Sequence, residues 1–202
     1  SVSPIESPEE LVYLSVYAPE DVGEMLSSAE TRGRIRRLSI PHLFFGLKEM
    51  DEQEINSLLP HVTEAQWTGI LDLDLWTRDQ MSCWKFLYWQ GHISEAEDAV
   101  ARKLLRAVDP ELLEMTFKTE MKIYARVEED EFEQEPEEGE LFETPDKNYL
   151  ILLPADADKA RLLRALILRL YGLDHEYAGL LMESTRARTA VEIEETAYQK
   201  RK

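Results

Sequence analysis

The amino-terminal half of the chain repeats a short apolar pattern every twelve residues. Four polar residues mark the starts of the repeat, and an apolar residue stands eight positions after each of them. In three of the four segments an apolar residue also stands four positions after the start. Because positions four and eight share one face of a helix, each segment predicts an amphipathic helix of about two turns. The starts are Ser27, Ser39, Asp51 and Thr63, position eight holds Ile35, Leu47, Leu59 and Leu71, and position four holds Thr31, Leu43, Ile55 and Trp67.

A helix of about two turns cannot bury its apolar face alone, so it must stack on neighbours as helical repeats do. The alternative is coincidence, because leucine-rich helical proteins readily produce such spacings. Capping boxes support the helix starts, since a short oxygen-bearing side chain caps the first turn and a Glu or Gln three residues later reaches back. The boxes are Ser7…Glu10, Asp51…Glu54, Thr63…Gln66 and Ser94…Glu97, and proline marks two more starts at Ala18-Pro19 and Asp109-Pro110.

Residues 109–126 predict a longer helix, after which the composition changes. Between Glu128 and Glu140, nine of thirteen residues are acidic, and Pro136 and Gly139 interrupt the segment. Like charges at that density repel one another, and the segment has little apolar content to order it. We therefore expect residues 127–140 to form a mobile acidic loop.

The clearest hairpin pattern follows this acidic segment. Residues 141–144 and 149–153 flank a turn sequence, Pro145-Asp-Lys-Asn148. Two strands alone are marginally stable, so we expect them to pack on helices or to take a third strand, for which residues 123–127 are the candidate. Two helices follow, one over residues 158–172 and one that begins at the N-cap Asp174.

Together these elements predict a mainly α protein. Residues 1–126 are expected to form a superhelix of short stacked helices, and residues 141–202 a small α+β unit of a hairpin and helices, with the acidic loop between them. Residues 187–202 read as a last helix, and neither glycine nor proline ends it. We therefore expect the native chain to continue past Lys202.

The net charge of −18 narrows the possible partners. It argues against nucleic acid and against anionic lipid, because both would be repelled. The single cysteine, Cys83, cannot form an internal disulfide, and no apolar run reaches the length of a membrane span. The amino terminus lacks a signal-peptide pattern, so we expect a cytoplasmic protein without membrane insertion.

Residues that could carry chemistry are present, but they do not form known motifs. The four histidines, His42, His61, His92 and His175, have no metal-ligand spacing, and the sequence has no phosphate loop. Cys83 lacks a neighbouring base, so a small buried side chain is the favoured interpretation over a nucleophile. We expect no cofactor, no metal and no catalytic residue.

Acidic and aromatic clusters between residues 67 and 89 have structural interpretations beside functional ones. Asp72, Asp74 and Asp79 could hold a hard cation weakly, or could only solvate a helix end. The aromatic residues could line a peptide groove, although a buried core is favoured. These aromatic residues are Trp67, Trp76, Trp84, Phe86, Tyr88 and Trp89.

One basic cluster stands out on this acidic chain. Arg32, Arg34, Arg36 and Arg37 occupy four of six consecutive positions. Nucleic-acid binding would need more cations on one surface. An acidic partner protein, or the acidic loop of the chain itself, is the simpler target, and these four arginines are the candidate partner-binding residues.

Two resemblances add to this interpretation. The short helices of residues 7–122, with Pro-Glu or Asp-Glu starts and Leu-Leu endings, resemble the cytosolic amino-terminal domain of the magnesium-transporter E family and the middle region of the flagellar motor-switch protein G. The run Trp67-Thr-Gly-Ile-Leu-Asp-Leu-Asp-Leu-Trp76-Thr-Arg-Asp79 and the segment Glu194-Glu195-Thr-Ala-Tyr198 resemble an uncharacterised bacterial family, of deltaproteobacterial type, whose function is unknown. The second resemblance implies no activity.

We therefore expect a helical-repeat module for protein interaction or scaffolding, and not an enzyme. A regulatory domain that senses magnesium is the alternative, implied by the resemblance to the transporter. An uncharacterised enzyme whose residues converge from distant positions is the third possibility. The sequence leaves the oligomeric state open.

Overall fold

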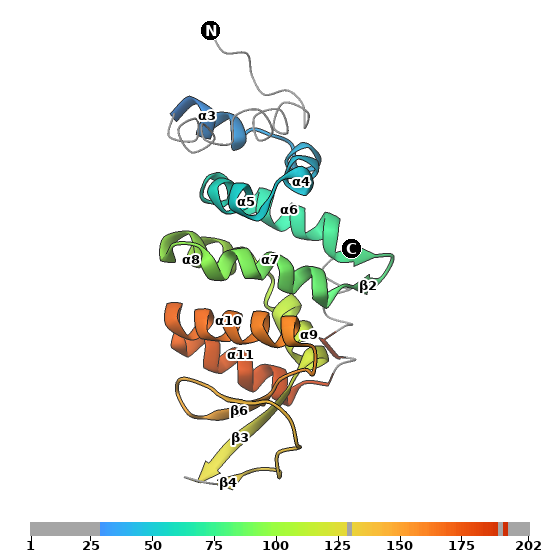
Figure 1. The fold of residues 1–202 in the computed structure, drawn as a ribbon, viewed down its shortest axis with the longest axis vertical. Coiled ribbons are helices and arrows are strands. Elements are labelled where there is room, and N and C mark those ends of the chain that lie inside the picture. The colour runs from blue at the N-terminus through green and yellow to red at the C-terminus, as the bar shows by residue number, and fades with distance from the viewer. Residues whose placement is uncertain (1–28, 129–130, 190–191, 194–202) are drawn as a thin grey trace. The chain divides into compact units, whose positions relative to one another are not determined.

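The computed structural model describes residues 29–128, 131–189 and 192–193 (Figure 1). The fold is mainly α with a small antiparallel β part, as the sequence predicts. The described chain divides into two compact units. Unit 1 contains the described residues up to Trp76 together with Glu95–Ala107, and unit 2 contains Thr77–Ser94 and the described residues from Val108 onwards. No described helix is long and apolar enough to cross a membrane.

Unit 1 consists of short helices, three of which begin where the twelve-residue pattern predicts. Ser39, Asp51 and Thr63 are the N-cap residues of three of them, and the capping boxes at Asp51 and Thr63 are complete in both directions. At Ser39 the hydroxyl contacts His42 Nδ1 (2.8 Å) and does not cap the backbone. The helices are α3 (Ala29–Ile35), α4 (Ile40–Glu49), α5 (Glu52–Leu58), the 3₁₀ turn η1 (Leu59–His61), α6 (Glu64–Leu75) and α8 (Asp98–Ala107).

The predicted apolar face is the core of unit 1. All four residues at position eight, and the three apolar residues at position four, are at most 2% exposed. Asp74, eleven residues after the start at Thr63, is a polar residue that is also buried, and it forms an ion pair with Lys48 at 2.9 Å. The pattern therefore identified the buried face correctly, while the superhelical repeat itself stays a prediction.

Unit 2 contains longer helices and a four-stranded sheet. Helices α10 and α11 lie side by side, and α11 also packs against α9 (Figure 1). Asp109, Asp156 and Asp174 cap the amino ends of α9, α10 and α11 with their carboxylates. The helices are α7 (Cys83–Glu95), α9 (Pro110–Glu120), α10 (Ala157–Leu173) and α11 (His175–Ala187).

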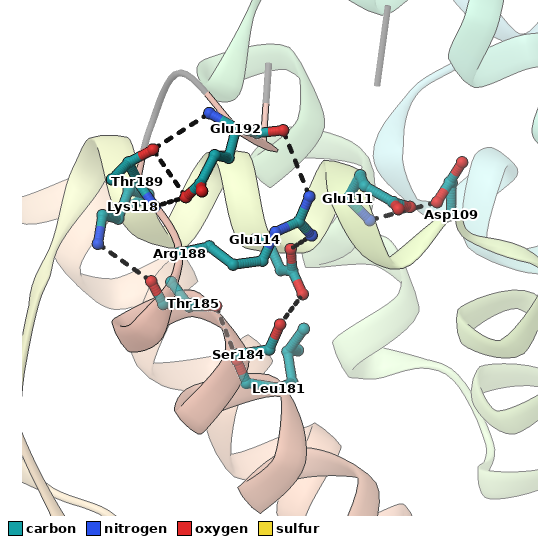
Figure 2. Close-up of polar contacts among 10 residues, drawn as sticks. All are labelled: Asp109, Glu111, Glu114, Lys118, Leu181, Ser184, Thr185, Arg188, Thr189 and Glu192. Carbon is teal, nitrogen blue, oxygen red and sulfur yellow. Dashed lines mark hydrogen bonds and ion pairs between the residues drawn. The ribbon is translucent and has the colours of Figure 1, made fainter. Parts of the chain in front are cut away.

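A buried carboxylate fixes the end of α11 to α9. Glu114, 5% exposed, accepts hydrogen bonds from the Ser184 hydroxyl at 2.5 Å and from the Arg188 guanidinium (Figure 2). Beyond Arg188, Thr189 and Glu192 form a capping box, which marks a helix start close to the predicted residue 187. The rest of that helix, from residue 194, lies outside the described residues, as do the predicted starts at Ser7, Ala18 and Ser27.

The sheet of unit 2 confirms the predicted hairpin and its third strand. Its order is β4-β3-β6-β5, and every neighbouring pair is antiparallel. The pair Ile123 and Ile151 and the pair Ala125 and Tyr149 stand opposite each other and so share one face. The strands are β3 (Lys122–Glu128), β4 (Glu131–Phe132), β5 (Leu141–Glu143) and β6 (Tyr149–Leu152), and a separate two-stranded sheet is formed by β1 (Trp76–Thr77) and β2 (Gln80–Met81).

Different parts of unit 2 contact the two faces of this sheet. On the face that carries Tyr149, the Tyr149 hydroxyl donates to Glu183 of α11, and Arg164 of α10 lies over the Phe142 ring. On the opposite face, the Tyr124 hydroxyl accepts a hydrogen bond from the Glu137 backbone N–H. The acidic segment therefore contacts the face that the helices leave open.

Residues 131–140, the described part of the segment expected to form a mobile acidic loop, contain a strand and form ion pairs, while the mobility of the segment stays a prediction. We call residues 131–140 the acidic strap, because it contains strand β4 and forms ion pairs with three separate elements. Gly139 adopts a φ of +154°, and a Cβ there would lie 2.6 Å from Leu152 Cδ1, so the strap approaches the sheet as closely as glycine permits. The ion pairs are Glu133–Arg186, Glu137–Lys122 and Glu140–Arg164. The strap has few apolar residues, and ion pairs together with the pairing of β4 with β3 hold it against the rest of unit 2.

Three expected boundaries also differ from the structure. The helix expected over residues 109–126 ends at Glu120, because residues 122–128 pair with β6 as a strand. Ser94 does not start a helix: it lies in the last turn of α7, where its hydroxyl donates to the Gln90 carbonyl. The expected domain of residues 1–126 is interrupted, since Thr77–Ser94 belongs to unit 2, where Gly91 of α7 approaches Leu162 of α10.

Truncation of the buried face should destabilise the protein. We expect Leu59→Ala and Leu71→Ala each to lower the free energy of unfolding by about 2–5 kcal/mol, because both remove fully packed side chains. Leu73→Ala on the same helix α6 is the matched control, since Leu73 is 49% exposed. Urea denaturation followed by circular dichroism measures all three, and equal losses for Leu71 and Leu73 would refute the assigned face.

Candidate functional site

The predicted arginine cluster lies at the carboxyl end of α3. Arg32 and Arg34 stand in the last turn of the helix, where cations interact favourably with the helix dipole. Arg36 and Arg37 follow in the turn that ends the helix, and both side chains are exposed. The four residues thus have different surroundings, and the exposed pair is the better placed to contact a partner.

Two residues that the sequence did not associate with this cluster complete it. Burial is the main cause that lowers the pKa of His61, and the positive charges of Arg32, Arg36 and Lys103 of α8 lower it further. Burial and then Arg36 lower the pKa of Lys103 as well, against an opposing contribution from Glu64. Cations on α3, in the turn after it and on α8 therefore disfavour the protonated form of His61 on η1. We call this group the cation centre: Arg32, Arg36, Arg37, His61 and Lys103.

Hydrogen bonds to backbone carbonyls hold the cation centre in place. The Lys103 ammonium donates to the carbonyl of Val62 at 2.6 Å and to that of Pro60 at 3.4 Å, on either side of His61. Gln66, 4% exposed, donates through Nε2 to the carbonyls of Ile35 (2.8 Å) and Leu38 (2.9 Å). These bonds fix both the 3₁₀ turn that carries His61 and the turn that carries Arg36 and Arg37.

The remaining histidines are spread over other surroundings. His42 and His175 are exposed, whereas His92 is buried and its ring meets that of Tyr88 edge-on at 5.0 Å. Within the described residues, no three side chains of His, Cys, Asp or Glu are placed to hold a metal ion together. We assign no metal ligand among them.

The structure places Cys83 in a half-buried position at the start of α7. Burial is the main cause that raises the pKa of its thiol, and hydrogen bonding with Thr119 and Thr116 opposes the rise. A raised pKa leaves less thiolate at neutral pH, which is the form that reacts. These surroundings fit a packed side chain better than a nucleophile.

The three candidate carboxylates and the aromatic cluster also separate into different surroundings. Asp74 is buried and neutralised by Lys48, whereas Asp72 and Asp79 are exposed. Among the aromatic residues, Trp67, Phe86 and Trp89 are fully buried, which confirms a core role for these three. Trp84 is 44% exposed. A continuous aromatic groove is therefore not what these residues form.

The first prediction for this site concerns the pKa of His61. We expect Arg36→Gln to raise the pKa of His61, because a nearby positive charge that disfavours the imidazolium is removed. Arg37→Gln removes the neighbouring exposed guanidinium, which is not among the groups that shift His61, so the pKa should stay unchanged. Titration of the histidine ring signals by NMR measures both variants, and an equal response would refute the assigned contact.

The second prediction concerns the contribution of the buried Gln66 amide to stability. Gln66→Leu should lower the free energy of unfolding by about 1–3 kcal/mol, because it leaves buried carbonyls without their donor. Gln53→Leu on the exposed face of α5 is the matched control and should change stability by less than about 0.5 kcal/mol. Urea denaturation compares the two, and a neutral Gln66→Leu would show that water replaces the lost bonds.

Comparison with known proteins places the chain in a family but does not supply an activity. No curated protein and no solved structure matches it. A family model described as a family of unknown function, DUF6178, matches residues 12–202. Because this match covers nearly the whole chain, it confirms the expected membership in a family of unknown function: the chain belongs to the DUF6178 family.

Proposed function

We propose that this protein is an interaction module whose unit 1 binds an acidic segment of a partner protein through the cation centre. Arg36 and Arg37 provide the exposed contacts, and Arg32 and Lys103 provide the positive field behind them. The proposed role is binding alone, without a reaction on the partner. Unit 1 is proposed to act as a scaffold of stacked short helices, in line with the resemblance to the magnesium-transporter E family that the sequence pattern suggests.

The proposal rests on the positive electrostatic field around His61. On a chain of net charge −18, cations from α3 and the turn after it, and from α8, lower the pKa of His61. Positive charge is therefore concentrated here in spite of the overall balance. A bound carboxylate would relieve the repulsion among these cations, so it gains more at this centre than at an isolated lysine.

The overall charge also limits which anion can bind. Surface charges interact strongly only within a Debye length, about 8 Å at physiological salt. A short acidic peptide segment needs to contact only the cation centre, whereas a long nucleic acid meets repulsion from the net negative charge of the chain. The same reasoning disfavours an anionic membrane.

The magnesium-sensing alternative receives less support from the described carboxylates. A hard cation needs several oxygen ligands around one position. Lys48 already neutralises Asp74, and the described residues contain no cluster of three acidic or ligating side chains. We therefore rank the interaction module above the cation sensor.

Charge reversal at the exposed arginines tests the proposal. The double variant Arg36→Glu, Arg37→Glu should bind a fluorescent octaglutamate peptide at least tenfold more weakly than the original chain, because it replaces two attractive charges with repulsive ones. The affinity of the original chain should also fall as salt increases. Fluorescence anisotropy measures the affinity, and circular dichroism verifies the fold.

The control variant makes the same charge change elsewhere. Arg161→Glu with Lys147→Glu alters two exposed cations of unit 2 and should leave octaglutamate binding within about twofold, because neither side chain belongs to the proposed interface. Retained binding by the Arg36 and Arg37 variant would exclude the cation centre as the interface. Cys83→Ser and His42→Ala should have little effect on proteins captured from cells, and a loss confined to either would favour an enzyme instead.

A further inference from the structure

A cavity of about 400 Å³ opens beside strand β3 in unit 2. Its lining comes from the end of α9, the first half of β3, the acidic strap and the end of α11. Met121 and Tyr124 contribute apolar surface, each 7% exposed, and Ile123 of β3 lies between them. Lys122, Glu135 and Glu137 add charge at the rim. The cavity therefore follows the edge of a strand and not only the surface between helices.

The direction of the β3 hydrogen bonds makes this edge an open one. Arg126 N–H donates to the Asn148 carbonyl, on the β6 side, at 2.9 Å. Alternate residues of an antiparallel strand direct their backbone groups to opposite sides, so the N–H and C=O of Ala125 and Ile123 point away from β6. The Ala125 carbonyl confirms this direction, since it accepts from Glu133 N–H of the strap at 3.0 Å. Ile123 therefore directs its N–H and C=O toward the cavity.

Strand β4 occupies only the far half of this edge. It pairs with β3 at Arg126 and Glu128, with an irregular register between them. Beyond Glu133 the strap leaves the edge, and Glu137 reaches the Tyr124 hydroxyl on the face of the sheet instead. Within the described residues, strand pairing on this side does not extend to Ile123. The chain itself thus shows that the edge accepts a strand, and it leaves the near half available.

The charge beside the open edge selects the kind of strand that fits. The acidic strap has six glutamates, and three of them pair with Lys122, Arg164 and Arg186. Glu131, Glu135 and Glu138 are exposed and form no ion pair with the described residues. Lys118 at the other side of the cavity is engaged by the carbonyls of Thr185 and Arg186, at 3.1 and 3.4 Å. Of the three unpaired glutamates, Glu135 lines the cavity, whereas Lys118 keeps its positive charge because carbonyls are neutral. The unpaired charge is therefore negative on the strap side of the cavity and positive at the end of α9.

We propose that this edge binds an extended basic peptide, which pairs with Ile123 as an added strand and directs its lysines or arginines toward the unpaired glutamates of the strap, of which Glu135 lines the cavity. Backbone hydrogen bonds supply affinity in such strand addition, and alternate side chains supply specificity. The peptide continues the line of β4 toward the end of α9, with an apolar residue over Met121. This site is separate from the cation centre and has the opposite charge preference.

Other occupants make different demands on the same site. An acidic peptide would meet the three unpaired glutamates and be repelled. A second copy of this chain that paired its own β3 edge would bring two acidic straps together, which like-charge repulsion opposes. A small anion could pair with Lys118, but it would also meet the carboxylates of Glu135 and Glu137, and Lys122 and Arg186 already pair with strap glutamates. A basic extended segment satisfies both the open backbone groups and the charge.

A proline substitution separates the proposed role of Ile123 from its role in the fold. Ile123→Pro removes the N–H that points to the cavity but none of the hydrogen bonds between β3 and β6, and proline is tolerated where the strand N–H faces outward. We expect it to weaken binding of the probe peptide acetyl-(Val-Lys)₄-amide at least tenfold. Ile123→Ala is the matched control, because it shortens the same side chain and keeps the N–H, and it should change the affinity by less than about threefold. Fluorescence anisotropy with a labelled peptide measures both variants.

Two further measurements keep the proposal testable if Ile123→Pro fails to fold. In the original chain, the (Val-Lys)₄ peptide should slow hydrogen exchange of the Ile123 amide at least tenfold, with little change at Tyr124, whose N–H already bonds to β6. Glu135→Lys with Glu138→Lys should abolish the preference for (Val-Lys)₄ over acetyl-(Val-Glu)₄-amide. Unchanged exchange at Ile123, equal binding of the two peptides to the original chain, or self-association of the chain in place of peptide binding would each overturn the proposal.

Discussion

The Gln66 side chain connects two helix ends that would otherwise leave backbone groups unpaired inside unit 1. Its Oε1 accepts from the Thr63 N–H at the start of α6, and its Nε2 donates to carbonyls at the end of α3. Both helices are short, so neither is stable without its neighbours. A single buried amide therefore sets the distance and orientation of α3 relative to α6, and the packing of the apolar face follows from it.

The cation centre depends on the same kind of bond. Lys103 binds the carbonyls on either side of His61, as Gln66 binds those at the end of α3. Arginine and lysine side chains repel one another and disfavour the protonated form of His61, so they stay close only where hydrogen bonds to the backbone hold their segments together. The proposed binding of an acidic segment is a consequence of this arrangement, because the stability of unit 1 maintains a positive field that the isolated side chains would disperse.

In unit 2 charge has a structural role as well. The acidic strap is ordered by ion pairs to α10, α11 and β3, and it contacts the sheet face that the helices leave open. Exposed ion pairs each contribute little, typically less than about 1 kcal/mol, so several of them together with β4 are needed to hold the strap. The glutamates that remain unpaired give the open edge of β3 its negative character. One segment thus completes the fold and selects a basic partner for the edge.

The sequence by itself determined the elements whose information is local. Capping residues at Asp51, Thr63 and Asp174, the apolar face that includes Leu59 and Leu71, and the hairpin around Pro145 all depend on neighbours a few residues apart. Only the tertiary structure decided that residues 122–128 form a strand, because that choice depends on pairing with β6 more than twenty residues later. It also decided that residues 131–140 form ion pairs with β3, α10 and α11 and that Lys103 joins Arg36 and His61, since ion pairs and fields depend on distance in space. The open edge at Ile123 has no sequence signal at all, because it results from where β4 stops.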